Sequence, residues 1–365
     1  MRYLLTILLI CVLQFVDCAH APKSSVANAP NTDEQLVSTI AEAKKAVVFI
    51  GITNIKSQER GHGSGFLITT DGYILTAWHV VNHADSTIQA CLYENAVERY
   101  GDLERENCQP ASLIGFDPQR DVALLKIQGT DFPVIQLGED PPVGQKIIAL
   151  GHPNRSLWTA TEGIVSKNPT FFFGDNYNDP YFLQTDAPIY FGSSGGPLIS
   201  RQGQVVGIVD MMTLSTNGEI TGINLAVPIG DLKILLPRLM EGGKVTRANL
   251  GMHYAFLHDL NFQTMSNDFK AYKLPEKVPG TLALFIIPGG VAEKNGLTKG
   301  DIILKVNDQM MSNIVDVTRL ISFQKPGTEV VLEIMRQGET KFVTVRLNEK
   351  PEPKPEKAPK SSPKK

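Results

Sequence analysis

Residues 185–198 read TDAPIYFGSSGGPL, and this short segment holds the most informative pattern in the chain. Its centre is Gly-x-Ser-Gly-Gly, which places the serine of the motif at Ser194. Glycines reach backbone conformations that other residues avoid, so consecutive N–H groups can converge beside one hydroxyl. The pattern predicts a nucleophilic serine and an oxyanion-binding backbone within one turn. Ser193 competes as nucleophile, but we expect it to supply only its backbone.

Two upstream segments strengthen this interpretation. Residues 76–81, TAWHVV, follow two apolar runs joined by Asp71-Gly72, which is a strong hairpin signal. His79 is therefore expected at a corner between a strand and a helix. Residues 117–127, DPQRDVALLKI, place Asp121 at the start of a buried strand. Histidine, aspartate and serine in this order match the order of the chymotrypsin-type triad.

Each residue also has a plainer interpretation. Asp121 could simply cap the turn before its strand. Histidines in apolar surroundings are usually structural, and we expect that role for His62, His83, His152, His253 and His258.

Taken together, these segments resemble the HtrA/Deg-type serine proteases, from about residue 36 to about residue 347. The matching stretches are GSGFLI at 63–68, TAWHVV at 76–81, RDVALLK at 120–126, the segment 185–198 and GINLAVP at 222–228. The resemblance implies a mainly β protein with a chymotrypsin-like double β-barrel followed by an α+β PDZ domain.

The chain departs from the family pattern at four positions without losing a triad member. They are Trp78, Tyr190, Phe191 and Ser193, where the family usually has asparagine, asparagine, proline and asparagine. Tyr190 and Phe191 adjoin the oxyanion turn, so the resting geometry of that turn is an open question.

Five parts are expected along the chain. They are a signal peptide at 1–21, a connector at 22–35, a trypsin-like serine protease domain at 36–241, a PDZ domain at 249–348 and a disordered Pro/Lys tail at 350–365. A capping box at Thr32 predicts a helix through about Lys44. Short β-branched and aromatic runs from Val47 to Pro228 predict antiparallel barrels. A closing helix at 231–240 and a flexible junction at 241–244 should follow.

The first residues have the features of an export signal. A basic Arg2 precedes an apolar run at 4–16, and Ala19-His20-Ala21 offers a cleavage site. The run is short for a membrane span. Cys18 leaves a lipid anchor as an alternative, although the preceding residue fits such a signal poorly. We expect an exported protein, periplasmic or secreted.

Charge and cysteine content narrow the partners further. The formal net charge of −3 argues against nucleic acid as a main partner. Removal of the signal leaves Cys91 and Cys108, an expected disulfide in an oxidising compartment, with two free thiols as the alternative. The sequence suggests no metal site and no cofactor.

The resemblance also implies binding partners. PDZ domains add a peptide to a sheet edge and hold its terminal carboxylate, here with the loop at Leu250, Gly251 and Met252. The alternative is that these residues only pack the linker. The helix near residue 36 is a candidate contact in a homotrimer or higher oligomer. The aromatic-rich segment 167–182 is a candidate sensor loop.

The expected chemistry is acyl transfer by His79, Asp121 and Ser194, with an oxyanion hole formed by the backbone of Gly192, Ser193 and Ser194, mainly through the first and last amides. Substrates would be unfolded proteins or peptides. The predicted substrate pocket, which favours small or medium aliphatic residues, is formed by Ile189 and, opposite it, Asn224, Leu225 and Ala226.

Three functions follow from this chemistry. The leading one is a quality-control endopeptidase in a stress response. The alternatives are a regulatory protease for one client and a non-enzymatic chaperone or peptide-binding scaffold.

Overall fold

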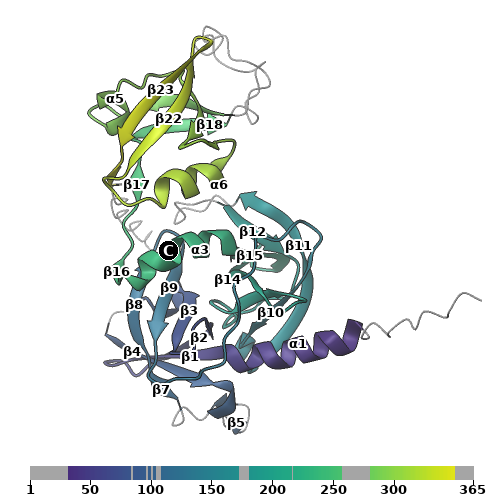
Figure 1. Ribbon diagram of the computed structural model, residues 1–365. Helices are drawn as coiled ribbons and strands as arrows, with labels where there is room; N and C mark the ends of the chain where they lie inside the picture. Colours follow the sequence, from purple (N-terminus) through teal and green to yellow (C-terminus); the bar gives the residue numbers. More distant parts are fainter. Residues whose placement is uncertain are drawn as a thin grey trace, which may run out of the picture.

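The computed structural model describes residues 32–83, 85–95, 98–99, 102–103, 108–171, 181–215, 217–256 and 280–349. Two β lobes lie side by side, and a third unit sits above helix α3 (Figure 1). The predicted signal peptide, most of the connector and the predicted tail lie outside the described residues. Within the described part, no helix is both long and apolar enough to cross a bilayer.

The first lobe is an eight-stranded sheet with the order β16-β8-β9-β3-β2-β1-β4-β7. Helix α1 (Thr32–Ala46), which the sequence predicted, leads directly into it. Its strands are β1 (Val47–Asn54), β2 (Arg60–Leu67), β3 (Tyr73–Ala77), β4 (Ser86–Leu92), β7 (Gln109–Pro110), β8 (Ser112–Asp117), β9 (Val122–Lys126) and β16 (Gly243–Lys244). Smaller elements are α2 (Trp78–Val81), η1 (Tyr93–Asn95), β5 (Glu98–Arg99) and β6 (Asp102–Leu103).

The β2–β3 hairpin positions the histidine of interest. The two strands pair antiparallel, and Gly72 at the turn has a φ of +99° that favours glycine. Strand β3 is fully buried from Ile74 to Ala77, and α2 follows it at once. His79 therefore lies at the corner between strand and helix, as predicted.

The second lobe is a closed barrel with the order β10-β11-β12-β15-β14-β13. Its strands are β10 (Lys146–Gly151), β11 (Thr159–Phe171), β12 (Tyr181–Thr185), β13 (Pro197–Ser200), β14 (Val205–Leu214) and β15 (Ile220–Pro228), with η3 (Pro153–Arg155) between the first two. Helix α3 (Ile229–Met240) closes the lobe and packs on β8 of the first one. One apolar cluster runs through both lobes, so they share a core.

The predicted flexible junction at 241–244 is wrong in one respect, because half of it is a strand. β16 pairs in parallel with β8, and Val245 N–H donates to the Phe116 carbonyl over 2.8 Å. Gly242 and Gly243 have φ values of +89° and +74°, which turn the chain back onto the sheet. The linker is thus anchored to the first lobe.

The third unit is an α+β domain around a sheet with the order β18-β19-β20-β22-β23, with β21 paired to β20. Its elements are β17 (Ala248–Asn249), β18 (Met252–Phe256), β19 (Thr281–Ile286), α5 (Val291–Lys294), β20 (Ile302–Val306), β21 (Gln309–Met310), α6 (Ile314–Val317), η5 (Thr318–Ser322), β22 (Glu329–Arg336), β23 (Glu339–Arg346) and β24 (Asn348–Glu349). Its buried residues form a separate core, as expected for an independent domain.

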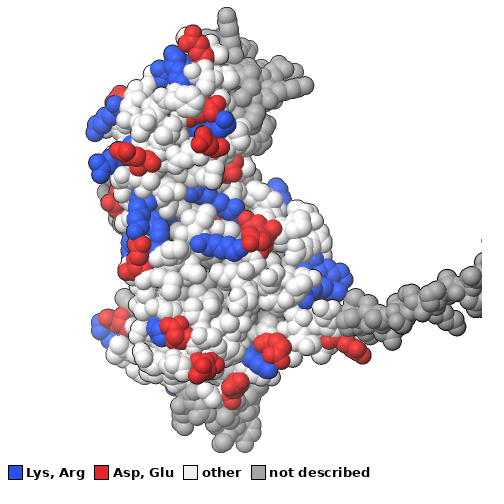
Figure 2. Space-filling view, in the orientation of Figure 1, with Lys and Arg blue, Asp and Glu red and all other residues white. Residues whose placement is uncertain are grey.

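Buried ion pairs and one aromatic side chain join this domain to the barrels. Arg247 binds Asp117 over 2.7 Å with both side chains fully buried, and its guanidinium lies 4.3 Å from the ring centroid of Phe323. Phe323 is 2% exposed and belongs to the core of the barrels. Figure 2 shows basic and acidic side chains together across the junction between the barrels and the third unit. The domain is therefore held against α3 by packing and charge.

A disulfide joins Cys91 of β4 to Cys108, with the two Cα atoms 4.3 Å apart. Cys108 precedes β7, which pairs with β4 at Ala90 and Gln109. The bridge therefore closes the polar excursion 92–107 at the edge of the first sheet, where the sequence placed it.

Candidate active site

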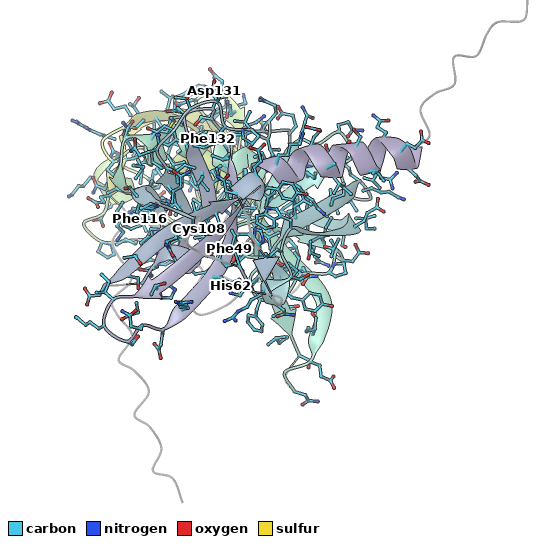
Figure 3. The ribbon with its side chains drawn as sticks, turned by 90° about the horizontal axis from the view of Figure 1, so that it is seen from below. Phe49, His62, Cys108, Phe116, Asp131 and Phe132 are labelled. Carbon is cyan, nitrogen blue, oxygen red and sulfur yellow. A yellow bond between two sulfur atoms is a disulfide. The ribbon has the colours of Figure 1, made fainter. Side chains whose placement is uncertain are left out.

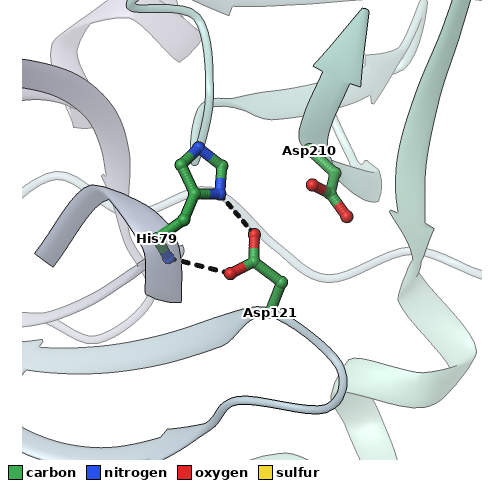
Figure 4. A group of neighbouring side chains, drawn as sticks. All are labelled: His79, Asp121 and Asp210. Carbon is green, nitrogen blue, oxygen red and sulfur yellow. Dashed lines mark hydrogen bonds and ion pairs between the residues drawn. The ribbon is translucent and has the colours of Figure 1, made fainter. Parts of the chain in front are cut away.

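His79 and Asp121 contact each other at two points. The backbone N–H of His79 donates to Asp121 Oδ1 over 2.8 Å, and His79 Nδ1 lies 2.5 Å from Asp121 Oδ2 (Figure 4). Asp121 adopts a left-handed φ of +57°, which aspartate tolerates better than most residues. Because Nδ1 faces the carboxylate, the proton of the neutral ring stays there and Nε2 remains basic.

The loop before Asp121 is fixed by its neighbours. Trp78 N–H donates to the Asp121 carbonyl over 3.1 Å, and the indole stacks on Phe116 with centroids 4.0 Å apart. Arg120 is fully buried and binds Asp231 of α3 over 2.6 Å. The tryptophan that departs from the family pattern thus packs beneath the pair and leaves its geometry intact.

The turn before Ser194 corrects one expectation. Ser193 N–H donates to the Tyr190 carbonyl over 3.0 Å, and Gly192 has a φ of +96°, as the third residue of a type II turn requires. The Ser193 amide closes this turn, so it is occupied and does not belong to an oxyanion hole. The predicted contribution of Ser193 is therefore wrong.

Gly192 and Ser194 are placed differently. The Phe191 carbonyl accepts a hydrogen bond from Asn154 N–H over 2.7 Å, and in a trans peptide the following N–H points the opposite way. Within the described residues, neither the Gly192 nor the Ser194 amide has a backbone acceptor. The sequence predicted that these two amides bind an oxyanion. Both N–H groups are available to donate to a substrate oxygen.

Ser64 ties this turn to the first lobe. Its fully buried hydroxyl donates to the Gly192 carbonyl over 2.7 Å and accepts from His152 N–H over 3.1 Å. Its backbone N–H donates to the Ser194 carbonyl over 2.8 Å, and Thr76 Oγ1 donates to its carbonyl over 2.7 Å. Sequence reasoning noted residues 63–68 only as a matching motif and missed this role.

The Ser194 hydroxyl donates to the carbonyl of Asp210 over 2.9 Å. Ser194 and His79 line the same cleft, which has a volume of about 320 Å³. To attack a carbonyl carbon, the hydroxyl must exchange the Asp210 carbonyl for His79 Nε2. Such bonds are often incomplete in unliganded sites and tighten only when substrate binds.

The wall of this cleft differs in part from the prediction. Ile189 lines it as expected, but Asn224, Leu225 and Ala226 are not among its lining residues in the described chain. These three lie in β15 and are at most 2% exposed, and the Asn224 amide donates to Ala187 O over 2.8 Å. The opposite wall is formed instead by Met211, Met212 and Leu214 of β14.

Two histidines expected to be structural lie next to the turn. His152 is fully buried and accepts a hydrogen bond from Trp158 N–H over 3.1 Å; burial lowers its pKa to about 3. His62 stacks on Phe49 with centroids 5.5 Å apart (Figure 3), and a side chain at Gly192 would collide with it. Gly192 is therefore required for space as well as for its backbone conformation.

A second hollow lies in the third unit. The predicted residues Leu250, Gly251 and Met252 line a cavity of about 470 Å³, together with Val291 and Ile321. Gly251 has a φ of +69°, which favours glycine. Strand β18 is the edge of its sheet. An edge strand beside an apolar hollow can receive an extended peptide.

The carboxylate of Asp121 controls the basicity of His79. Burial of the ring lowers its pKa, but the hydrogen bond and the negative charge of Asp121 raise it, and the net pKa lies above 6.5. His79 is thus a stronger base than an ordinary histidine, and it needs Asp121 to be one.

Two family profiles match the chain. The profile "Trypsin-like peptidase domain" matches residues 63–208, and the profile "PDZ domain" matches residues 286–336. The first match includes His79, Asp121 and Ser194, and the second lies wholly within the third unit.

The chain is similar to curated proteins named "Probable periplasmic serine endoprotease DegP-like". It is 37% identical over 292 residues to the one from Pseudomonas fluorescens, covering 80% of this chain and 56% of that protein. It is 33% identical over 313 residues to the one from Chlamydia trachomatis serovar D, covering 83% and 58%. The chain spans little more than half the length of these relatives.

Solved structures of serine proteases are also similar to this chain. The chain superimposes on "HtrA-type protease AlgW with tripeptide" with a TM-score of 0.70 and 27% identity, covering 87% of this chain and 98% of that one. It matches the serine endoprotease from Yersinia pestis with a TM-score of 0.58 and 28% identity, at the same coverage.

A titration of the histidine rings by NMR tests the His79–Asp121 pair. We expect the His79 signal, assigned by its loss in His79→Gln, to titrate with a midpoint above 6.5. Asp121→Asn removes the carboxylate hydrogen bond and the negative charge of Asp121, which are the two larger influences that raise the pKa, so the midpoint should fall below the wild-type value. The His152 signal is the internal control and should not titrate between about pH 5 and 8. A midpoint that is the same in both proteins would contradict the pairing.

Proposed function

The chain belongs to the HtrA/Deg type, with a trypsin-like peptidase domain followed by a PDZ domain, and from that premise we propose that it is an exported serine endopeptidase that cleaves unfolded or misfolded proteins. One observation carries the proposal. His79, which is paired with Asp121, lines the same cleft as Ser194, and the N–H groups of Gly192 and Ser194 have no backbone acceptor in the described chain.

In this mechanism, His79 Nε2 takes the proton of Ser194 as Oγ attacks the peptide carbonyl carbon. The negative charge that develops on the carbonyl oxygen is stabilised by the N–H groups of Gly192 and Ser194. His79 then returns the proton to the leaving amine as the C–N bond breaks. Water, activated by the same ring, hydrolyses the ester on Ser194. Asp121 keeps the ring oriented and balances its positive charge.

The cleft wall supports a preference for aliphatic side chains. Ile189, Met211 and Met212 line it with uncharged side chains. A pocket for basic residues uses a buried acid to bind the substrate side chain, whereas the buried acid that lines this cleft, Asp210, has its carboxyl group within 4.8 Å of the ligand atoms of His79 and Asp121. Exposed Phe191 and Leu214 extend the apolar surface outward, with 72% and 50% of each exposed. Such a surface suits chains that present apolar segments, as unfolded proteins do.

The proposals for cellular location and oligomeric assembly are based on the names of the relatives and on the sequence. The curated relatives are named periplasmic, which agrees with export directed by residues 1–21. We propose a homotrimer or higher oligomer with α1 as a contact. Val37 of this helix is 68% exposed, so it has an apolar side chain available for a partner.

Control by the PDZ domain has a physical route in the ion pairs at the domain junction. Arg319 of the PDZ domain binds Asp231 over 2.8 Å and Asp140 over 2.7 Å. Asp231 also binds Arg120, the residue before Asp121, and accepts from the Tyr181 hydroxyl over 2.8 Å. Tyr181 lies near the end of the proposed sensor segment 167–182, of which residues 172–180 lie outside the described part of the chain. C-terminal peptides bound near Gly251 could act on the active site through this network, in proportion to their differential affinity for the two states.

Two other functions make different demands on the molecule. A non-enzymatic chaperone or peptide-binding scaffold would need a closed oxyanion turn, and the available amides of Gly192 and Ser194 favour the enzyme instead. A regulatory protease for one client would use the same chemistry and would differ in its narrow range of substrates.

Replacing the nucleophile tests the enzymatic function. Purified protein lacking residues 1–21 should degrade unfolded casein, and Ser194→Ala should reduce the rate by roughly 10⁴–10⁶-fold because no acyl-enzyme can form. Ser193→Ala is the matched control and should retain activity, since the Ser193 backbone N–H closes the turn over 3.0 Å and the hydroxyl adds only a weak contact of 3.5 Å with the Tyr190 N–H. If wild-type protein binds casein without cleaving it, the scaffold is the correct function. Loss in Ser193→Ala alone would instead identify Ser193 as the nucleophile.

Replacing Arg319 tests the route of control. A hydrophobic C-terminal peptide should stimulate cleavage of a small aliphatic chromogenic substrate by wild-type protein. Arg319→Gln breaks the link between the domains but leaves Asp231 paired with Arg120, so stimulation should fall several-fold. Lys325→Gln removes an exposed pair with Glu241 at the same junction and should keep the stimulation. Equal stimulation in all three proteins would exclude the Arg319 network as the route.

A further inference from the structure

Asp210 is a buried carboxyl group with no role in the proposed acyl-transfer steps. It lies in β14 at a β-bulge, because Val209 pairs with Ala226 and Met211 with Leu225, which leaves Asp210 unpaired between them. Bulges re-aim side chains near active sites. The residue is 1% exposed, and Figure 4 shows its carboxyl group beside the His79–Asp121 pair.

The Asp210 carboxyl group has no hydrogen-bond donor among the described residues. Ligand atoms of His79, Asp121 and Asp210 lie within 4.8 Å of one another. Both oxygens of Asp121 already accept hydrogen bonds from His79. In the described part of the chain, neither Asp210 oxygen has a hydrogen-bond partner. Two ionised carboxylates are both acceptors, so they cannot satisfy each other unless one of them carries a proton.

The cations nearby do not neutralise two ionised carboxylates. His79 is the cation that faces them when it is protonated. Arg120, a permanent cation whose charge also acts on Asp210, is held by Asp231, which also binds Arg319. Two like charges buried this close raise the pKa of one carboxyl group strongly. Burial and the negative charge of Asp121 raise the pKa of Asp210 well above its ordinary value.

A metal ion is the competing occupant of this cluster, and the distances disfavour it. His79 Nδ1 and Asp121 Oδ2 are 2.5 Å apart. Two such ligands bound to one tetrahedral zinc ion are about 3.3–3.6 Å apart, since each bond is about 2.0–2.2 Å long. The 2.5 Å separation is that of a direct charge-assisted hydrogen bond.

We propose that Asp210 is a positioning residue that carries a proton and donates it in a hydrogen bond to Asp121. The two carboxyl groups then present a single negative charge to His79, and Asp121 gains a further hydrogen bond besides those from His79. This role refines the proposed serine endopeptidase and rests on it, but the protonation itself does not depend on activity.

Infrared spectroscopy tests the proton directly. The difference spectrum at pH 7 between wild-type protein and Asp210→Asn should contain the carbonyl stretch of one protonated carboxylic acid, lost in the variant. If that band is absent, Asp210 is ionised and the proposal is wrong. This result holds whether or not the protein proves to be a protease.

The rate at which a fluorophosphonate labels Ser194, followed by intact mass, tests the hydrogen bond. Asp210→Asn keeps a donor without a charge and should label within about threefold of wild type, whereas Asp210→Leu should label roughly 10–100-fold more slowly. Equal slowing in both variants would overturn the proposal. If Asp210→Leu fails to fold, Asp210→Asn and its infrared spectrum still decide.

A titration with zinc completes the test. Added zinc should slow the labelling of wild-type protein and Asp210→Asn equally. Inhibition by zinc that occurs only when Asp210 is present would show a metal ligand instead of a proton donor, and the proposal would be wrong.

Discussion

A single buried serine holds the active-site turn in place. The hydroxyl of Ser64 donates to the Gly192 carbonyl, its backbone N–H donates to the Ser194 carbonyl, and its own carbonyl accepts from the Thr76 hydroxyl in the first lobe. Because Ser64 is fully buried, an unsatisfied carbonyl at this point would cost about 1–3 kcal/mol. Ser64 therefore makes one orientation of the turn much more favourable than others. Ser64 lies in the first lobe, which carries His79, and its hydrogen bonds fix the turn of the second lobe, which carries Ser194.

This arrangement explains why the unusual residues in the turn are tolerated. Phe191 contributes its carbonyl to Asn154, while 72% of the residue surface is exposed. Ser193 contributes its amide to the turn. In both cases a backbone group makes the main hydrogen bond, so the identity of the side chain matters little. Gly192 is the exception, because its φ of +96° and the nearby His62 exclude other residues. The turn thus constrains one position strictly and leaves its neighbours variable.

The sequence predicted local features well and long-range contacts poorly. The Asp71-Gly72 hairpin and the corner at His79 follow from turn chemistry and periodicity. The role of Ser64 could not be predicted, because its partners in the active-site turn, Gly192 and Ser194, lie more than a hundred residues away and meet it only when both lobes have formed. The same holds for Met211 and Asp210, since a bulge in β14 decides where they point. A bulge leaves no clear trace in a run of apolar residues. The junction at Gly243 was misjudged because glycines mark a turn without revealing the strand that follows.

The role of Ser64 can be measured directly by the rate at which a fluorophosphonate labels Ser194. Ser64→Ala removes only the hydroxyl, and Ser112→Ala, on the exposed start of β8, is the matched control. We predict that Ser64→Ala labels roughly 10–100-fold more slowly than wild type, that it still unfolds cooperatively on heating, and that the control is unchanged. A folded Ser64→Ala protein that labels at the wild-type rate would contradict this account.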